Sequence, residues 1–198
     1  MRILLNGRRG RVGSVLGPGL EMAGHTLVDG LAEADAMVDF TRPDAVSGNV
    51  RAAVAAGVPC VVGTTGWDVE EFRNAPVTVF YAPNFALGAV LMMRFAADAT
   101  RHLDGAEIVE LHHAAKVDAP SGTSQLTAQL MGGAVPIHSV RLPGLNAHQE
   151  VVLGAEGQTL VLRHDAISRA AYTPGVLLAL ERLPTLPPGL LVGLDALL

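Results

Sequence analysis

The first 84 residues alternate short apolar runs with segments of helical periodicity. The runs "RILL" at residues 2–5 and "AMVDFT" at residues 36–41 have the length and composition of buried strands. Between residues 44 and 56 the apolar residues recur on one face, which predicts a helix with Asp44 as its cap. Such alternation is typical of a doubly wound parallel sheet. We therefore expect an α/β fold whose N-terminal part is a Rossmann-like parallel sheet.

Two stretches in this part disturb the pattern. After the first strand, apolar residues at helical spacing predict a helix, but "GPG" at residues 17–19 should distort it. A second short run ends at Val28, and only "DGLAEAD" separates it from Ala36. A parallel crossover normally takes about a dozen residues or more. We therefore expect the sheet to be locally irregular at this point.

The second half has a different organisation. A helical pattern over residues 87–101 precedes the strand "AEIVELHH" and a helix over residues 123–131. Three further runs follow, "HSVRLP", "HQEVVLG" and "QTLVLRH", separated by glycine-bearing turns. These elements predict an α+β domain with a mostly antiparallel, mixed sheet. The tail "TPGVLLALERL" predicts a helix with Thr173 as cap and Pro174 in its first position.

Composition narrows the class of protein. Hydrophobic residues make up 49% and charged residues 17%, which indicates a globular protein. A net charge of -5 without any run of Lys or Arg argues against a nucleic-acid partner. The apolar tracts fall short of the roughly 20 residues that a membrane span needs, and the N-terminus lacks the pattern of a signal peptide. The single cysteine, Cys60, should be a buried thiol, so we expect a cytoplasmic protein.

Glycines mark a possible nucleotide site. Gly7, Gly10 and Gly13 stand in "GRRGRVG" between the first strand and a helix, which is the context of a dinucleotide fingerprint. Small residues there let the backbone approach a pyrophosphate at the positive end of the helix. A tight turn without a ligand is the alternative. A second turn, "GTTG" at residues 63–66, also follows a strand, and this favours nucleotide binding, although alone it is typical of an ordinary turn with a helix cap at Thr65.

The stretch "ELHHAAKVDAPSGTS" at residues 110–124 gathers the polar chemistry of the second half. His112 and His113 point to opposite faces of a strand, and no Cys cluster or HExxH accompanies them, so we expect no metal site. Lys116 alone would be a surface lysine. Residues 121–123 open the next helix, so that amides and hydroxyls converge near Lys116. This set suits a carboxylate with a proton donor beside it. A simple Ser or Thr N-cap also accounts for the helix start, but it leaves the neighbouring His and Lys unexplained.

At this point the chain resembles the dihydrodipicolinate reductase family. The resemblance covers nearly the whole length and includes, in order, "GRRGRVG", "VDFTRPDA", "GTTGW", "APNFALG", "ELHHAAKVDAPSGTS", "RLPGLNAHQEVVLG" and "GQTLVLRHDAISRAAYTPGV". The segment "HHAAKVDAPSGT" is the most specific of these. The departure is the short crossover after Val28, where the family has a longer segment with a helix, and it affects the ribose end of the cofactor site.

The resemblance implies a fold, a reaction and an assembly. A dinucleotide-binding domain would comprise residues 1–84 joined by residues 173–198, and residues 85–172 would form a substrate-binding and tetramerisation domain. The implied activity is NADH- or NADPH-dependent reduction of 4-hydroxy-tetrahydrodipicolinate (or dihydrodipicolinate, which differs from it by one water) to tetrahydrodipicolinate in diaminopimelate and lysine biosynthesis. The partners would be a small dicarboxylate substrate and three further copies of the chain in a homotetramer.

The resemblance also assigns roles to residues. The acid/base pair would be His112 and Lys116. The substrate carboxylates would be held by His113, Ser121, Gly122, Thr123 and Arg169. The cofactor would be lined by Gly7, Arg8, Arg9, Gly10, Arg11, Val12, Gly63, Thr64, Thr65, Ala82, Pro83, Asn84 and Phe85. Asp29 and Glu33 lie near the end of the second strand, where an acidic residue selects the ribose hydroxyl, so we expect NADH to serve at least as well as NADPH.

Two other functions stay open at the level of sequence. The first is a binding or regulatory protein that kept the fold without turnover, which the complete set of His and Lys residues disfavours. The second is an oxidoreductase of the same build that reduces another carbonyl or imine acid, which only a substrate assay separates from the first choice.

Overall fold

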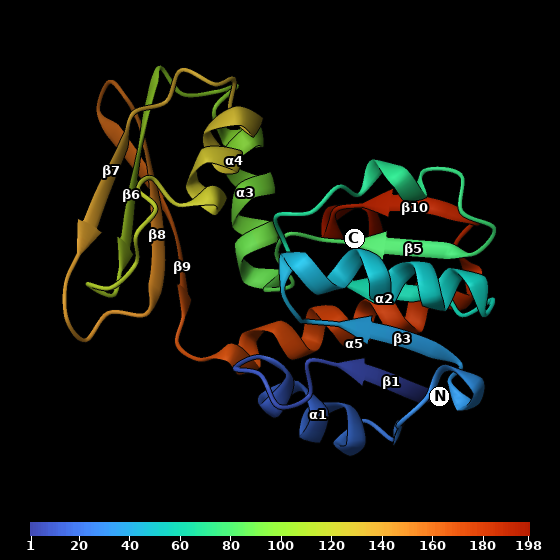
Figure 1. Ribbon diagram of the computed structural model, residues 1–198. Helices are drawn as coiled ribbons and strands as arrows, with labels where there is room; N and C mark the ends of the chain where they lie inside the picture. The colour runs from blue at the N-terminus through green and yellow to red at the C-terminus, as the bar shows by residue number, and fades with distance from the viewer. The chain divides into compact units, whose positions relative to one another are not determined.

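The computed structural model describes residues 1–198, and they form two compact units. The first unit comprises Met1–Leu87 and Arg169–Leu198, and the second comprises Gly88–Ser168. The chain therefore returns to the first unit after it has completed the second (Figure 1). None of the helices has both the length and the apolar character needed to cross a membrane.

A parallel six-stranded sheet forms the centre of the first unit, with the strand order β10-β5-β4-β3-β1-β2. Its strands β3 and β4 are buried along their whole length, as expected for a sheet that is covered on both faces. The expected Rossmann-like parallel sheet is thus confirmed. The strand bounds are β1 (Arg2–Asn6), β2 (Thr26–Val28), β3 (Ala36–Asp39), β4 (Cys60–Val62), β5 (Thr78–Tyr81) and β10 (Gly189–Val192).

Three α-helices cover this sheet. Helix α2 buries Val46, Val50 and Ala53 in one core cluster with Met37 of β3 and Cys60 of β4. The other two helices, α1 and α5, contact one another. The bounds are α1 (Gly13–Met22), α2 (Pro43–Ala55) and α5 (Thr173–Arg182). Short 3₁₀ helices complete the unit: η1 (Leu31–Glu33), η2 (Glu70–Phe72), η3 (Arg169–Tyr172), η4 (Leu183–Thr185) and η5 (Leu194–Leu197).

Three expectations about these helices are wrong in detail. Helix α1 continues through Pro18 without interruption. Helix α2 begins at Pro43, whose ring presets the helical φ, and the carboxylate of Asp44 accepts from the Arg42 side chain at 3.1 Å instead of capping the helix. Helix α5 follows η3 directly, so Thr173 is already helical and its methyl group lies beside Gly19 of α1.

The crossover between β2 and β3 contains only η1 and no α-helix. An ion pair joins the first residue of β1, Arg2, to Asp35, the residue before β3. The Nη2 atom of Arg2 donates to Oδ1 of Asp35 at 2.7 Å, and the Asp35 amide donates to the Arg2 carbonyl at 2.8 Å. The guanidinium of Arg2 also lowers the pKa of Asp35. Strands β1 and β3 pair in regular register from Ile3 and Ala36 onward, so the expected local irregularity does not occur in this pairing.

The second unit is built on a four-stranded mixed sheet with the order β7-β6-β8-β9. Strands β6 and β7 are parallel, whereas β6, β8 and β9 form antiparallel pairs, so the expected mixed sheet is confirmed. One face buries Ile108, Glu110, Val151 and Leu153. The bounds are α3 (Leu87–Ala99), β6 (Gly105–His112), α4 (Gly122–Leu130), β7 (Ile137–Arg141), β8 (Ala147–Ala155) and β9 (Gln158–Ala166).

The tight packing of Gly13 leads to a prediction about stability. A Cβ atom at Gly13 would overlap the carbonyl oxygen of Gly7, whereas a Cβ atom at the exposed helical residue Gly48 would meet nothing within 4 Å. Gly13→Ala should therefore lower the free energy of unfolding by about 1–3 kcal/mol. The control Gly48→Ala should raise it by up to about 1 kcal/mol, because alanine favours helix. Urea denaturation of both variants measures this difference, and stabilisation by both substitutions would contradict the packing at Gly13.

Candidate active site

The carboxyl ends of β1, β3 and β4 meet at one edge of the first unit's sheet. Strands β2 and β3 lie on opposite sides of β1, so the order in which strands are added to the sheet reverses between β1 and β3. Parallel sheets bind ligands at such switch points. Gly7 follows β1 with a φ of 83°, and a Cβ atom there would overlap the carbonyl oxygen of Phe40. Gly63, after β4, leaves no room for a Cβ atom against the Phe40 ring. Because these two residues have no side chain, the segments that follow β1, β3 and β4 can pack closely together.

A buried carboxylate fixes two of these strand ends. Asp39 is fully buried and accepts hydrogen bonds from the Thr41 hydroxyl, the Thr64 hydroxyl and the Asn49 amide, each at 2.7 Å. The Thr41 amide donates to Asp39 at 3.1 Å and to the Thr64 hydroxyl at 2.7 Å. Asp39 thereby links the turn after β3, the turn after β4 and helix α2. Thr64, which the sequence placed in the cofactor site, serves this link with its side chain.

A hollow of about 680 Å³ opens beside the first glycine turn. Its lining comes from β1, β2 and the turn: Leu4, Leu5, Asn6, Gly7, Arg8, Arg9, Ser14, Leu27, Val28 and Asp29. Arg8, Arg9 and Arg11 are exposed, and Arg8 pairs with Glu21 of α1 at 3.4 Å. The glycine turn and the end of β2 therefore share one hollow, with cations from the turn and a carboxylate from the strand end.

The remaining predicted cofactor residues belong to the same unit but differ in exposure. Thr65 and Pro83 are exposed, whereas Ala82 and Phe85 are buried. The Phe85 ring packs against Phe40 and Phe80, with centroids 5.5 and 6.1 Å away, so its side chain belongs to the core. Asn84 accepts from the Ala86 amide at 2.9 Å and shapes the turn before α3. Gly10 donates its amide to the Gly7 carbonyl at 2.7 Å, and the Val12 carbonyl accepts from the first turn of α1.

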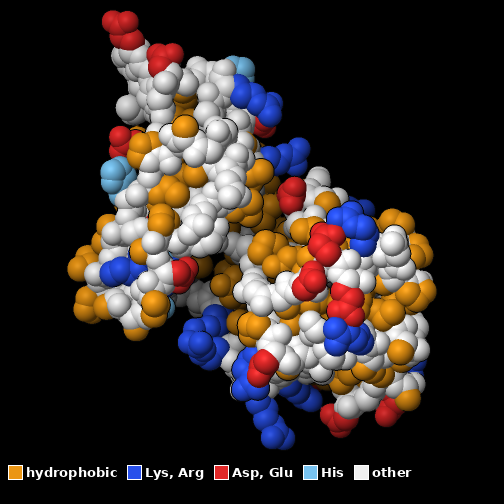
Figure 2. Space-filling model, turned by 45° about the horizontal axis from the view of Figure 1, so that its top comes forward, with side chains coloured by type: hydrophobic (Ala, Val, Ile, Leu, Met, Phe, Trp, Pro, Cys, Tyr) orange, Lys and Arg blue, Asp and Glu red, His pale blue; other side chains and the backbone are white.

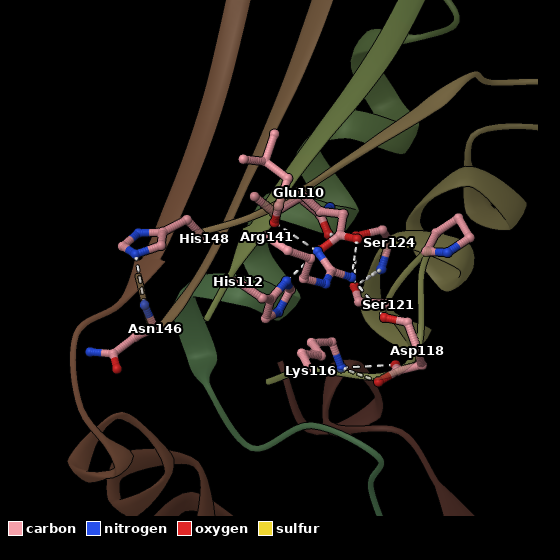
Figure 3. Close-up of polar contacts among 12 residues, drawn as sticks. Glu110, His112, Lys116, Asp118, Ser121, Ser124, Arg141, Asn146 and His148 are labelled. Carbon is pink, nitrogen blue, oxygen red and sulfur yellow. Dashed lines mark hydrogen bonds and ion pairs between the residues drawn. The ribbon is translucent and has the colours of Figure 1, made fainter. Parts of the chain in front are cut away.

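Polar side chains of the second unit converge where β6 ends (Figure 3). His112, the last residue of β6, directs Nδ1 at the carboxylate of Glu110, two residues earlier on the same face. Arg141 of β7 grips that carboxylate with two nitrogens, at 2.7 and 2.9 Å. The Glu110 side chain is fully buried, whereas 14% of His112 and 17% of Arg141 are exposed. One buried anion thus lies between an imidazole and a guanidinium.

The ionisation of this group follows from its surroundings. Burial raises the pKa of Glu110, but hydrogen bonds from Arg141, Ser139 and His112 outweigh burial, and the net pKa is lower than usual. Burial also lowers the pKa of His112, and Lys116 and Arg141 lower it further against the opposing effect of Glu110. At neutral pH Glu110 is therefore a carboxylate and Arg141 a guanidinium. Burial and the two cations favour the neutral imidazole of His112, whereas Glu110 favours its charged form.

Lys116 lies in the segment between β6 and α4. Its Nζ atom contacts both carboxylate oxygens of Asp118, at 2.7 and 2.8 Å. The lysine lowers the pKa of Asp118 through these bonds. Asp118 itself is 59% exposed, and its carbonyl oxygen accepts from Nη2 of Arg141 at 2.7 Å. Arg141 therefore joins the segment of Lys116 to the carboxylate that holds His112 (Figure 3).

Helix α4 begins beside this group. Ser121 caps it, with its hydroxyl accepting from the Ser124 amide at 3.2 Å, after a cis peptide bond between Ala119 and Pro120. The Ser124 hydroxyl donates to Oε1 of Gln149 at 2.8 Å, and Nε2 of Gln149 donates to Thr127 at 2.8 Å. Gln149 of β8 lies opposite Glu110 in the sheet. These bonds fix the N-terminus of α4, which includes Gly122 and Thr123, on the face that carries Glu110.

The second unit holds the predicted acid/base pair and four of the five predicted substrate residues. His112, Lys116 and Ser121 lie around one point (Figure 3), and Gly122 and Thr123 follow Ser121 in the first turn of α4. His113 follows β6 directly, is exposed, and its carbonyl oxygen accepts from the Lys116 amide at 3.0 Å. Arg169 lies in η3, which belongs to the first unit.

Sequence reasoning assigned no role to Glu110, Asp118, Arg141 or Gln149. Glu110 could have been found, because residues two apart on a strand share a face and Glu110 precedes His112 by two. Arg141 could not, because its place beside His112 depends on the parallel register of β6 and β7. The same holds for Gln149, which reaches the site through the antiparallel pairing of β6 and β8.

The first unit has a parallel sheet with a glycine turn, and the second presents a histidine, a lysine and a helix N-terminus. This combination is typical of reductases that use a nicotinamide nucleotide. Comparison with known families agrees: the model of "Dihydrodipicolinate reductase, N-terminus" matches residues 18–85, and that of "Dihydrodipicolinate reductase, C-terminus" matches residues 88–198. The chain belongs to the dihydrodipicolinate reductase family, and the expected membership is confirmed.

Individual relatives support this assignment. The 4-hydroxy-tetrahydrodipicolinate reductase of Mycobacterium ulcerans (strain Agy99) is 38% identical over 243 aligned positions, which cover 100% of this chain and 99% of the relative. The Thermobifida fusca enzyme of the same name is 43% identical, with 83% and 81% covered. The dipicolinate-bound dihydrodipicolinate reductase of Paenisporosarcina sp. TG-14 superposes with a TM-score of 0.86 at 29% identity, with 100% and 99% covered.

The buried acceptor Asp39 yields a prediction for this edge of the sheet. Asp39→Ala leaves the donors of Thr41, Thr64 and Asn49 without their shared acceptor, so it should lower the free energy of unfolding by about 2–4 kcal/mol. The control is Asp44→Ala, which removes a carboxylate that is 69% exposed and should cost less than about 1 kcal/mol. Chemical denaturation measures both, and equal losses would contradict the role of Asp39.

Proposed function

We propose that this protein reduces 4-hydroxy-tetrahydrodipicolinate to tetrahydrodipicolinate with a reduced nicotinamide nucleotide, as a step of diaminopimelate and lysine biosynthesis. Membership of the reductase family supports the reaction class and the pathway. The observation that carries the substrate assignment is the cluster in the second unit. There a histidine and a lysine lie beside the N-terminus of α4, which suits a small dicarboxylate.

Substrate carboxylates fit the start of α4. The first amides of a helix have no partner within the helix and favour anions. A Cβ atom at Gly122 would meet nothing within 4 Å, so the packing of the chain does not require glycine there. A ligand that approaches the backbone closely explains the glycine instead. We assign carboxylate binding to His113, Ser121, Gly122 and Thr123, and we add Arg169 as a further cation.

The nucleotide fits the first unit. Its glycine turn lies at the switch point of a parallel sheet, the residues of the turn are held by backbone contacts, and a hollow opens beside them. When bound, the nucleotide supplies the hydride. We assign its binding to the two glycine turns and to residues 82–85, of which the buried Ala82 and Phe85 act through the backbone or through the shape of the turn.

His112 and Lys116 deliver the proton to the substrate. Loss of the substrate's 4-hydroxyl group as water gives a conjugated imine. Hydride addition to this imine leaves negative charge, and a proton donor must neutralise it. Lys116 is held by the exposed carboxylate of Asp118, and a substrate carboxylate can replace that partner. His112 can deliver a proton from Nε2, because its Nδ1 atom is engaged by Glu110. The two residues form one unit for proton delivery.

We also propose a homotetramer in the cytoplasm. The second unit exposes large hydrophobic side chains, among them Leu142, Leu160 and Val161 with 53%, 40% and 51% of their surface accessible. Figure 2 shows hydrophobic side chains open on the molecular surface. Contact with further copies of the chain would cover such residues.

The reaction is tested by mixing the purified protein with a reduced nucleotide, pyruvate, aspartate semialdehyde and the synthase of the preceding step. Absorbance at the nicotinamide band should fall only when all components are present. A fall with pyruvate or aspartate semialdehyde alone would favour an oxidoreductase for another carbonyl acid. No fall in the complete mixture would overturn the proposed reaction.

The first functional prediction concerns the proton donors. His112→Ala and Lys116→Ala should each lower kcat by roughly 10²-fold or more while nucleotide affinity is kept. The double variant should be little slower than the slower single variant, because members of one unit are not additive. Steady-state kinetics and nucleotide titration measure these quantities, and an unchanged kcat in both single variants would refute the assignment.

The second functional prediction concerns the choice of nucleotide. Asp29 lines the same hollow as Arg8 and Arg9, and a 2′-phosphate would meet that carboxylate. Arg8 pairs with Glu21, which leaves Arg9 as the other cation that lines the hollow. We therefore predict that kcat/KM with NADH equals or exceeds that with NADPH at fixed salt. A strong NADPH preference that disappears in Arg9→Ala would show instead that the glycine turn reads the phosphate.

A further inference from the structure

We infer that Glu110 and Arg141 are positioning residues of the reaction, which set the tautomer and orientation of His112. This inference rests on the proposed function and names two residues that make no direct contact with the reacting atoms. The only contact of the Glu110 carboxylate with the proton-delivery pair is through Nδ1 of His112.

The geometry fixes His112 from one side. Glu110 and His112 share a face of β6, and the β7 residue in register with His112 is Arg141. The β8 residue opposite His112 is Ala147, which leaves the ring no second polar partner on that side. Glu110 is therefore the group that holds Nδ1, and Nε2 is left for the substrate (Figure 3).

The burial of Glu110 argues for a role in the reaction. A fully buried carboxylate costs free energy unless it is paired, and replacing a buried ion pair with apolar residues is often neutral or stabilising. Arg141 provides the pairing through two parallel hydrogen bonds, at 2.7 and 2.9 Å. A core that needed only stability would be served equally well by apolar residues on this face, beside Ile108 and Val151.

The chemistry follows from the tautomer. A carboxylate that accepts from Nδ1–H leaves Nε2 as the atom that gains and loses the proton. When Nε2 carries a proton the ring is positive, and Glu110 stabilises that form. When Nε2 has given up the proton, the Nδ1–H tautomer remains and Nε2 is ready to be reprotonated. Without Glu110 the ring could turn or take the other tautomer, and Nε2 would be in the correct state less often.

Arg141 extends the same control to Lys116. The guanidinium keeps Glu110 ionised and, through Nη2, holds the carbonyl oxygen of Asp118 at 2.7 Å. Asp118 in turn contacts Nζ of Lys116. One arginine thus ties the histidine and the segment of the lysine to the same buried anion, so that both donors keep a fixed separation.

The test compares Glu110→Gln with Glu107→Gln. Glu107 lies on the same strand and also contacts a histidine, His138 at 2.9 Å, but both side chains are more than half exposed, which makes it a matched control. Glu110→Gln should lower kcat at least about tenfold, with the substrate KM and nucleotide Kd changed less than about twofold. Glu107→Gln should leave kcat unchanged.

The pH profile gives a readout that a structural role would not change. The charged groups that act on His112 are Glu110, Lys116 and Arg141, and of these Glu110 alone raises its pKa. In Glu110→Gln the pKa of His112 should therefore fall, and the decline of kcat toward high pH should begin at a lower pH than in wild type. The same substitution in a His112→Ala background should cause no further loss, because Glu110 acts through the proton-delivery unit that His112→Ala already disables.

Each outcome decides a separate question. A wild-type protein without reductase activity overturns the proposed function and this inference with it. In an active wild type, an unchanged kcat in Glu110→Gln, or a loss that adds to that of His112→Ala, overturns this inference alone. Should Glu110→Gln fail to fold because Arg141 is left without its partner, Glu110→Gln with Arg141→Met removes both buried charges, and the same kinetic results are required of it.

Discussion

The second unit is organised around a carboxylate that the protein has removed from water. Glu110 is fully buried in the face of a sheet, and such a charge is tolerated only with close partners. Its partners come from two neighbouring positions: Arg141 from the adjacent parallel strand, and His112 from the end of its own strand. Arg141 also donates to the carbonyl oxygen of Asp118, so the position of the segment between β6 and α4 depends on the same buried carboxylate.

The first unit shows the same principle with backbone contacts. Gly7, Gly13 and Gly63 are packed so closely that no side chain fits, and Asp39 ties two strand ends to helix α2. The short crossover does not disturb this edge, because Arg2 and Asp35 close the sheet at the opposite end of β1. The alignment with the Mycobacterium ulcerans relative spans 243 positions for the 198 residues here, so the relative has segments that this chain lacks.

Much of this architecture could be predicted from the sequence. Apolar runs located β1, β3 and the strands of the mixed sheet, because buried strands need such runs. Strand β10 was not predicted, since its four residues, Gly189–Val192, become a strand only by pairing with β5, more than a hundred residues earlier. The caps expected at Asp44 and Thr173 were wrong, because a proline starts one helix and a 3₁₀ turn precedes the other.

The candidate site was predictable only where it is local in sequence. His112, Lys116 and residues 121–123 lie within one motif, and the start of α4 follows from its serine cap. Arg141 and Gln149 join them through strand register, which the sequence does not state. The partner of a cation is equally invisible in the sequence: Arg8 pairs with Glu21 of α1, thirteen residues later, at 3.4 Å.

The central claim is that Glu110 holds the Nδ1–H of His112 and leaves Nε2 for proton transfer. Nitrogen-15 NMR of the wild-type protein labelled at histidine, with His112 assigned by comparison with His112→Ala, measures this directly across a pH titration. We predict a neutral form protonated at Nδ1. A neutral form protonated at Nε2 would contradict the role of Glu110.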